Sequence, residues 1–267
     1  MSQVRQHKPL ERGTRLAGKR VIVTGLGGGI GRACALLFVM QGAEVVGCDI
    51  STEAAEALLD EARSQNLTLH CMYPLDLVAP GGAEALVAFT RAQMGGVDVV
   101  VNAAAFAAFA WLQEMDYEAQ WKFTLRGELD IVFLLCKAAW PALVAAGGGA
   151  VINFASANAM MALPGSPALA HCAGKAGVLG MTRQLAMEGA PHNIRVNAIS
   201  PALIETPATR AHMTQDPGFK DQAMAKAMVR RIGQPEDIAW AAVYLASEEA
   251  SWVTAANLPV DGGSTAW

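Results

Sequence analysis

The stretch VIVTGLGGGIGRACALLF, residues 21–38, decides the fold. An apolar run that ends near Gly25 predicts a buried strand, and a helix is expected from about Ile30 to Gln41. A glycine cluster separates them. Glycine tolerates positive φ angles and lets the backbone approach a pyrophosphate closely. The N-terminus of the following helix offers free N–H groups and a partial positive charge. The stretch therefore predicts a strand, a loop and a helix that together bind a dinucleotide.

An acidic residue at the end of the next predicted strand narrows the choice of dinucleotide. Asp49, in VVGCDIS, follows Gly25 by 24 residues, which is close to the spacing of a carboxylate that holds the adenosine ribose. A carboxylate there accepts hydrogen bonds from both ribose hydroxyls and repels a 2′-phosphate. No Arg or Lys stands in GLGGG or beside Asp49. The sequence predicts NAD rather than NADP. The alternative is that Asp49 only caps the next helix.

Apolar β-rich segments alternate with helix-like segments along the chain. Strands that are almost continuously apolar and are separated by helices indicate a parallel sheet covered on both faces. We expect one α/β, doubly wound, Rossmann-like domain over 16–267, preceded by a flexible arm over 1–15 and carrying a helical lid at about 206–231. Its sheet is expected to be seven-stranded and mostly parallel. The expected strands lie at 19–25, 43–50, 67–76, 97–105, 149–157, 193–201 and 257–263.

Composition limits the classes of partner. The chain has 267 residues, of which 53% are hydrophobic and 16% charged, so burial of further surface in an oligomer is expected. A net charge of −4 favours neither nucleic acid nor an anionic membrane. No apolar run is long enough to span a bilayer, and the polar start does not predict a secretory signal. Five cysteines without a CxxC spacing predict free thiols in a reducing cytoplasm and no metal site.

Several motifs together resemble the short-chain dehydrogenase/reductase family. TGLGGGIG, residues 24–31, matches the cofactor signature TGxxxGIG of that family, VVVNAAA at 99–105 is similar to its NNAG element, and VDGG at 260–263 closes the chain as usual. The resemblance extends from about Leu16 to the C-terminus. It implies that NAD is bound by Thr24, Gly25, Gly29, Ile30, Gly31, Asp49, Asp76, Leu77, Asn102, Ala103, Lys175, Pro201, Ile204 and Thr206.

The same resemblance implies a catalytic set in which two positions are changed. VINFASA places Ser156 at the catalytic serine, and PALAHCAGKAGVLGMTR at 167–183 places Lys175 at the lysine of YxxxK. His171 stands where the family has its catalytic tyrosine. Glu128 stands where an asparagine is expected. The resemblance therefore implies Ser156, His171, Lys175 and Glu128 as catalytic residues of an atypical site.

Histidine chemistry is compatible with this position. Residues four apart share one face of a helix, so His171 and Lys175 are expected to point at the same site. An unperturbed histidine titrates at about pH 6.5 and serves as a general acid or base. Glu128 is expected to pair with Lys175 or with the imidazolium form of His171. We expect an NAD-dependent alcohol dehydrogenase in which His171 replaces the tyrosine.

Other classes of function remain open from the residues alone. His171 is also consistent with a packed histidine in a silent NAD-binding protein. Ser156, His171 and Glu128 are also the residue types of a nucleophile, a base and an orienting acid, which is compatible with a lyase or a hydrolase. No G-x-S-x-G motif surrounds Ser156, which disfavours a hydrolase of the common type.

Apolar residues near the predicted site suggest a hydrophobic secondary alcohol or its ketone as substrate. Phe109 and Trp111 belong to this apolar set. The resemblance also implies a homotetramer or a homodimer. We expect the substrate to contact Ala105, Phe106, Ser156, Asn158, Met160, Met161, His171 and Met213.

Overall fold

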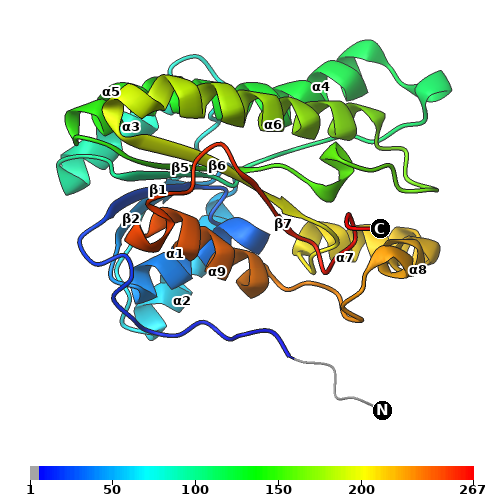
Figure 1. Cartoon of the computed structure of the whole chain (residues 1–267), viewed down its shortest axis with the longest axis horizontal. Coiled ribbons are helices and arrows are strands. Elements are labelled where there is room, and N and C mark those ends of the chain that lie inside the picture. Colours follow the sequence, from blue (N-terminus) through cyan, green and yellow to red (C-terminus); the bar gives the residue numbers. More distant parts are fainter. Residues whose placement is uncertain (1–5) are drawn as a thin grey trace.

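Seven parallel strands form the centre of the structure, which is a computed structural model that describes residues 6–267 (Figure 1). Their order across the sheet is β3-β2-β1-β4-β5-β6-β7, and each neighbouring pair is parallel. The expected α/β doubly wound fold is confirmed, with a sheet that is parallel throughout. The strands are β1 (Arg20–Thr24), β2 (Glu44–Cys48), β3 (His70–Met72), β4 (Val99–Asn102), β5 (Gly149–Phe154), β6 (Ile194–Pro201) and β7 (Asn257–Val260).

Helices cover both faces of the sheet (Figure 1). One layer holds α1, α2 and α9, and the layer on the opposite face holds α3, α5 and α6. Two further helices, α7 and α8, extend beyond the sheet. The bounds are α1 (Gly29–Met40), α2 (Thr52–Ser64), α3 (Gly82–Met94), α4 (Phe123–Leu125), α5 (Ile131–Ala145), α6 (Leu169–Gly189), α7 (Pro207–Gln215), α8 (Pro217–Lys226) and α9 (Pro235–Ala246).

Alternation along β1 explains why both faces need a helical cover. Successive side chains of a strand point to opposite faces. Val21 and Val23 belong to the core cluster that includes Phe38 of α1, whereas Ile22 belongs to the cluster that includes Leu135 of α5. All five side chains are fully buried. A strand that is apolar at every position is therefore satisfied only between two helical layers.

The strand order reverses beside β1, and this places the functional loops. β1 lies between β2 on one side and β4 on the other, so the connections after β1 and after β4 leave in opposite directions across the sheet. In open parallel sheets, ligands bind at such a switch point, outside the carboxyl ends of the strands. The glycine loop follows β1, and residues 103–111 follow β4, at this same edge.

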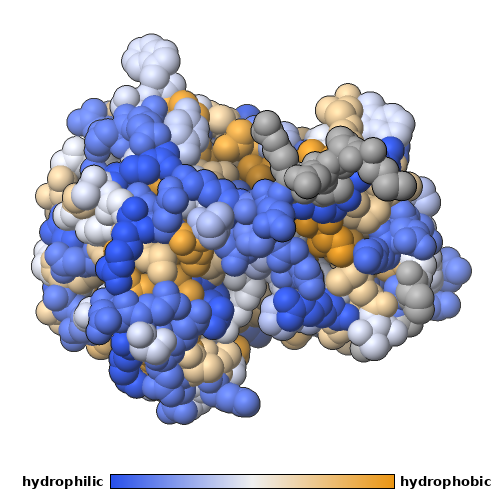
Figure 2. Space-filling view, turned by 90° about the horizontal axis from the view of Figure 1, so that it is seen from below, coloured by the Kyte–Doolittle hydropathy of each residue, from blue (hydrophilic) through white to orange (hydrophobic). Residues whose placement is uncertain are grey.

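The two segments predicted to lie outside the main layers differ in their contacts. Residues 1–5 of the expected arm lie outside the described residues, and residues 6–15 run along α9, where Trp240 Nε1 donates to Pro9 O at 3.2 Å. The expected lid at 206–231 contains α7 and α8. Hydrophilic residues cover most of the face that carries α1, α2 and α9, and apolar residues are visible there in smaller patches (Figure 2).

Two elements differ from the sequence prediction. β3 covers only His70–Met72 of the strand expected over 67–76, because the pairing with β2 ends at Cys48. The long helical region after Tyr117 is present, but it contains two π-helical segments, η2 (Tyr117–Lys122) and η3 (Arg126–Asp130). A π-helical turn holds one extra residue and rotates the side chains that follow it, and such turns are frequent at functional sites.

Close packing at the first turn of α1 gives a test of the fold. A Cβ atom on Gly31 would lie 2.2 Å from the carbonyl oxygen of Gly25, whereas a Cβ on Gly180 of α6 would meet nothing within 4 Å. We expect Gly31→Ala to lower the free energy of unfolding by about 1–3 kcal/mol through overpacking. Gly180→Ala is the matched control, and it should leave stability unchanged or raise it by about 1 kcal/mol. Urea unfolding measures both; equal stability of the two variants would contradict the packing.

Candidate active site

The loop between β1 and α1 has the geometry of a phosphate cradle. Gly25 and Gly29 have φ angles of 64° and 52°, a region that side chains other than glycine rarely adopt. Gly28 is the N-cap of α1, and no side chain caps this end of the helix. No acidic residue lies in the first turn of α1. The N–H groups at this helix end and the open space at Gly28 therefore fit a phosphate anion.

Thr24 joins this loop to the segment that follows β4. Its hydroxyl oxygen accepts hydrogen bonds from the N–H groups of Ala103 and Ala104 at 3.0 and 2.9 Å. Asn102, which the resemblance assigned to the cofactor, has its side chain buried and donating to Asn153 Oδ1 at 2.8 Å. The Asn102 amide therefore connects β4 to β5 within the sheet.

Asp49 lies at the end of β2 and faces the glycine loop. One carboxylate oxygen accepts from the Gly27 N–H at 2.9 Å, and the other accepts from the Ser51 N–H at 2.8 Å. The N-cap of α2 is Ser51, whose hydroxyl accepts from the Ala54 N–H. Asp49 is therefore positioned beside the loop, and the capping role belongs to Ser51.

The second acid expected to bind NAD has a local partner. Asp76 Oδ1 accepts from the Val78 N–H at 3.0 Å, and Leu77 between them is buried. This turn follows β3 at the same edge of the sheet as the loop after β1.

His171 joins two of the predicted catalytic residues. Its Nδ1 lies 2.5 Å from Glu128 Oε1, and its Nε2 lies 3.3 Å from Ser156 Oγ. An ionised carboxylate is only an acceptor, so Nδ1 carries the hydrogen and the Nε2 of the neutral ring accepts. The Ser156 hydroxyl then donates to Nε2, while its oxygen accepts from the Asn158 N–H at 3.1 Å.

Glu128 reaches His171 from the π-helical segment η3. Its side chain is 3% exposed, and its Oε2 has no hydrogen-bond partner among the described residues. Gly174 of α6 makes room for it, because a Cβ atom there would lie 2.9 Å from that oxygen. The glycine between His171 and Lys175 is therefore a requirement of the site that the sequence motifs did not single out.

Lys175 lies one turn after His171 on α6 and is buried. Its Nζ donates to the carbonyl oxygen of Phe154, at the end of β5, at 3.1 Å. Burial lowers the pKa of the Lys175 ammonium, and the negative charge of Glu128 acts in the opposite direction. Glu128 is thus hydrogen-bonded to His171, and it acts on Lys175 through its charge.

A cavity of about 640 Å³ brings these groups together. The segment expected to form a lid contributes His212 of α7 and Phe219 of α8, and Leu163 comes from the segment after η4 (Ala157–Ala159). Sequence reasoning did not single out these three residues, although it expected the lid to line the substrate pocket. The predicted residues that line the cavity are Ile30, Ala103, Ala105, Glu128, Ser156, Asn158, Met161, His171, Lys175, Pro201, Ile204 and Thr206.

Three of the residues expected to contact substrate are not in the lining of this cavity. Phe106 packs on Phe123, with ring centroids 4.7 Å apart. Met160 is 42% exposed and its sulfur accepts from Asn257 at 3.0 Å. Met213 lies on α7, but His212 is the residue beside it that reaches the cavity. In loops and short helices, no periodicity in the sequence indicates which neighbour faces inward.

Aromatic rings form a row along one wall of the cavity. Phe109 lies 5.7 Å from the His171 ring and 6.5 Å from the His212 ring, between ring centroids. His212 in turn packs edge-on against Phe219 at 4.4 Å. The lid therefore contacts the wall beside His171 through apolar ring surfaces.

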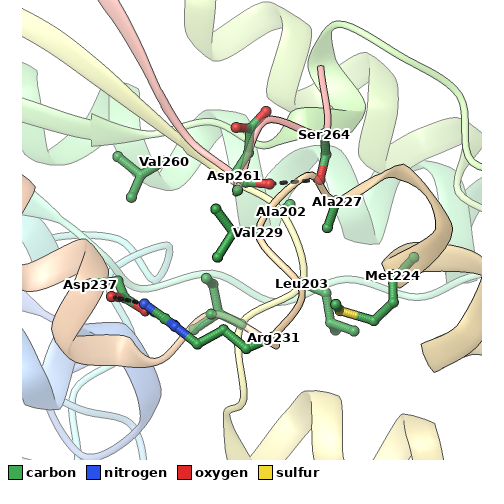
Figure 3. Close-up of a pocket in the computed structure, with 14 residues that line it drawn as sticks. Ala202, Leu203, Met224, Ala227, Val229, Arg231, Asp237, Val260, Asp261 and Ser264 are labelled. Carbon is green, nitrogen blue, oxygen red and sulfur yellow. Dashed lines mark hydrogen bonds and ion pairs between the residues drawn. The ribbon is translucent and has the colours of Figure 1, made fainter. Parts of the chain in front are cut away.

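A second cavity of about 200 Å³ shares the loop at 202–204 with the larger one (Figure 3). Its walls carry the ion pair between Arg231 and Asp237 and the hydrogen bond from the Ser264 hydroxyl to the carbonyl oxygen of Asp261. Groups of His, Cys, Asp or Glu that fit a metal ion are absent from the described residues. Within the same residues, no helix is both long and apolar enough to cross a membrane.

Comparisons with known proteins show the family of this chain. A family model described as enoyl-(acyl carrier protein) reductase matches residues 25–265. The D-threitol dehydrogenase of Mycolicibacterium smegmatis is 36% identical over 252 residues, 94% of this chain and 94% of that protein. A crystal structure from Burkholderia xenovorans, described as a short-chain dehydrogenase/reductase, superposes with a TM-score of 0.90 at 33% identity, covering 96% of this chain and 99% of that one.

The chain belongs to the short-chain dehydrogenase/reductase family. A further relative is the NAD-dependent glycerol dehydrogenase of Listeria innocua, 33% identical over 258 residues, 97% of this chain and 98% of that protein. These relatives are named as dehydrogenases of alcohols, which supports an oxidoreductase. The family uses nicotinamide cofactors, and the glycine loop with the uncapped end of α1 fits such a group.

Burial of Lys175 predicts a pH-dependent cost to the fold. Because its pKa is lowered from 10.5, the folded chain holds this proton less tightly than the unfolded chain. Protonation of Lys175 therefore destabilises the fold below the folded pKa, and this cost disappears as the pH rises through the unfolded pKa. We expect the stability of Lys175→Met relative to the wild type to fall as the pH rises from neutral toward about pH 10, because only the wild type then loses the cost of burying the ammonium group.

Urea unfolding at both pH values measures this difference. Lys137→Met is the matched control, because Lys137 is exposed on α5 and its replacement should show no comparable trend. A relative stability of Lys175→Met that does not fall between neutral pH and about pH 10 would contradict the expectation.

Proposed function

We propose that this protein is an NAD-dependent dehydrogenase that interconverts a hydrophobic secondary alcohol and its ketone, with His171 as the general acid and base. The observation that carries the proposal is the position of the His171 ring. It bridges Ser156 Oγ and Glu128 Oε1 inside the cavity that the glycine loop, β5 and the lid enclose. A packed structural histidine would not need both partners within a cavity.

His171 takes the proton in this scheme. Glu128 accepts from the Nδ1–H group, so Nε2 is the acceptor nitrogen, and an alcohol that takes the place of the Ser156 hydroxyl there can pass its proton to Nε2. Ser156 Oγ binds the substrate oxygen beside Nε2. NAD supplies the hydride acceptor when it is bound. As the alcohol proton moves to Nε2, the Glu128 carboxylate stabilises the imidazolium that forms. In ketone reduction, the imidazolium returns the proton.

Lys175 acts as a fixed cation beside this pair. Its hydrogen bond to the Phe154 carbonyl oxygen holds the ammonium group at the end of β5. By family resemblance, it binds the nicotinamide ribose. Its charge also lies close enough to Glu128 to compensate part of the negative charge of that buried carboxylate.

Asp49 supports NAD as the cofactor. Its carboxylate stands beside the Gly27 N–H, where a 2′-phosphate would meet a negative charge. Arg32, the first cation after the loop, is paired with Glu61 and so is engaged elsewhere. The similar glycerol dehydrogenase is named as NAD-dependent.

The lining of the cavity supports a substrate with an apolar body. Phe109, Met161, Leu163 and Phe219 line the space beyond His171. The relatives named for threitol and glycerol act on alcohols that are more polar. We therefore expect this chain to prefer alcohols that are more apolar than threitol and glycerol.

Self-association and a cytoplasmic location complete the proposal. Phe133 of α5 and Met187 of α6 are 51% and 60% exposed, on the layer where the resemblance implies a twofold contact. Burial of such side chains between subunits favours a homodimer or a homotetramer.

His171→Ala tests the acid–base assignment. NADH formation is measured over a panel of secondary alcohols for the wild type, His171→Ala and His171→Tyr. We expect His171→Ala to lower kcat by about 100-fold or more, because proton transfer loses its base. His171→Tyr should also lower turnover, because a tyrosine would have to ionise beside the buried Glu128 carboxylate. The matched control His192→Ala changes an exposed histidine outside the cavity and should behave as the wild type. Unchanged turnover by His171→Ala would refute the assignment.

Asp49→Ser tests the cofactor assignment. Serine still accepts a hydrogen bond but carries no charge to repel a 2′-phosphate. The ratio of kcat/KM for NAD to that for NADP is expected to fall by about tenfold or more, equivalent to about 1.4 kcal/mol. Asp60→Ser removes an exposed acid of α2 and should leave the ratio unchanged. A preference for NADP in the wild type would overturn the assignment.

A further inference from the structure

The two departures from the family pattern meet in one hydrogen-bonded chain. Glu128 comes from η3, Ser156 from the end of β5 and His171 from α6. Glu128 Oε1 lies 2.5 Å from His171 Nδ1, and His171 Nε2 lies 3.3 Å from Ser156 Oγ. The redox scheme uses these contacts to bind the substrate oxygen and to stabilise the imidazolium form of His171. The same contacts are also those of a nucleophile, a base and an orienting acid.

We propose that Ser156 is also an acyl-accepting nucleophile, and that this protein hydrolyses small aryl esters through a Ser156–His171–Glu128 triad. Such triads are recognised by geometry and roles, and they occur in several chain orders. The order here is acid, serine, histidine. The activity uses no nicotinamide cofactor, so it does not depend on the redox function proposed above.

The serine hydroxyl is oriented for this role. Its oxygen accepts from the Asn158 N–H at 3.1 Å, so its own hydrogen is free to point at His171 Nε2. The Glu128 carboxylate is 3% exposed, and its Oε1 fixes the tautomer in which Nε2 is the acceptor. In triads of this kind, the buried acid orients the imidazole and stabilises its charged form.

The proposed reaction balances without an oxidant or a reductant. Ser156 Oγ attacks the ester carbonyl carbon, and its proton passes to His171 Nε2. The bond from that carbon to the aryl oxygen breaks, and the proton leaves with the aryl alcohol. Water then attacks the acyl-serine and gives its proton to Nε2, which returns it to Ser156 Oγ as the carboxylic acid leaves. Ester and water are consumed, and acid and alcohol are formed.

The cavity supplies room and hydrogen-bond donors for this chemistry. Its volume of about 640 Å³ exceeds the space a small aryl ester needs, and Phe109 beside His171 offers a ring surface to the aryl group. The Asn158 side chain and the Lys175 ammonium line the same cavity and carry N–H donors for a developing oxyanion. Because these donors are side chains rather than a dedicated pair of backbone N–H groups, we expect ester hydrolysis to be slower than in an evolved esterase.

Two probes test the proposal: diisopropyl fluorophosphate, which phosphorylates activated serines, and p-nitrophenyl butyrate, which reports hydrolysis. Both are applied to the full chain without added NAD. We expect one diisopropylphosphoryl group on the peptide that contains Ser156. We also expect catalytic release of p-nitrophenol, reduced by about tenfold or more in Ser156→Ala, His171→Ala and Glu128→Gln. Ser64→Ala and His192→Ala change exposed residues outside the cavity and should behave as the wild type.

Omission of NAD separates this activity from the redox function, because only alcohol oxidation needs the cofactor. His171→Tyr should lose labelling and hydrolysis without NAD, because a tyrosine cannot accept the Ser156 proton at neutral pH. Circular dichroism of each variant verifies that it is folded. Absence of a label on Ser156 in the wild type, or labelling and hydrolysis that persist in His171→Ala, would overturn the proposal. Hydrolysis that persists in Ser156→Ala would come from another group and would also overturn the proposal.

Discussion

Glu128 is a buried carboxylate, and the arrangement of the site depends on how its charge is compensated. Transfer of an unpaired charge into a protein interior is costly, so a buried carboxylate needs hydrogen bonds and an opposite charge. Here His171 supplies the hydrogen bond, and Lys175 supplies the positive charge. Both lie on α6, one turn apart. Gly174, between them, leaves the space that the carboxylate occupies. The contact between η3 and α6 thus fixes the direction of the imidazole.

The fold could be predicted from the sequence because its signals are local. Continuous apolar strands such as β1 need cover on both faces, and the glycine cluster of α1 marks the edge where the ligand binds. Once strands and helices alternate, the sheet is parallel and the ends of β1, β4 and β5 meet at one edge. The short length of β3 could not be predicted, since it depends on where the backbone pairing with β2 ends.

The predicted site residues illustrate where such reasoning ends. Ser156, His171 and Lys175 could be brought together from a strand end and an i, i+4 spacing, which fix direction. The resemblance predicts Glu128 at the asparagine position, but which of His171 and Lys175 donates a hydrogen bond to it depends on a π-helical turn that leaves no mark in the sequence. Asn102 illustrates the opposite problem. Its position in a motif predicts a contact with the cofactor, but its side-chain amide donates a hydrogen bond to Asn153 within the sheet. Side-chain direction in the loops and in the lid is decided by packing.

His171 and Glu128 make physical sense only as a pair. A histidine opposite an asparagine would lack the charge that stabilises its imidazolium form. A glutamate opposite a tyrosine would bring a buried negative charge toward a group that must itself become negative to accept a proton, which like-charge repulsion disfavours. A tyrosine that carries the proton changes between a neutral and a negative form. With His171 and Glu128, the group that carries the proton changes between a neutral and a positive form. The Glu128 carboxylate lies against the imidazole ring and acts on the Lys175 ammonium through its charge, so one buried acid serves both residues of α6.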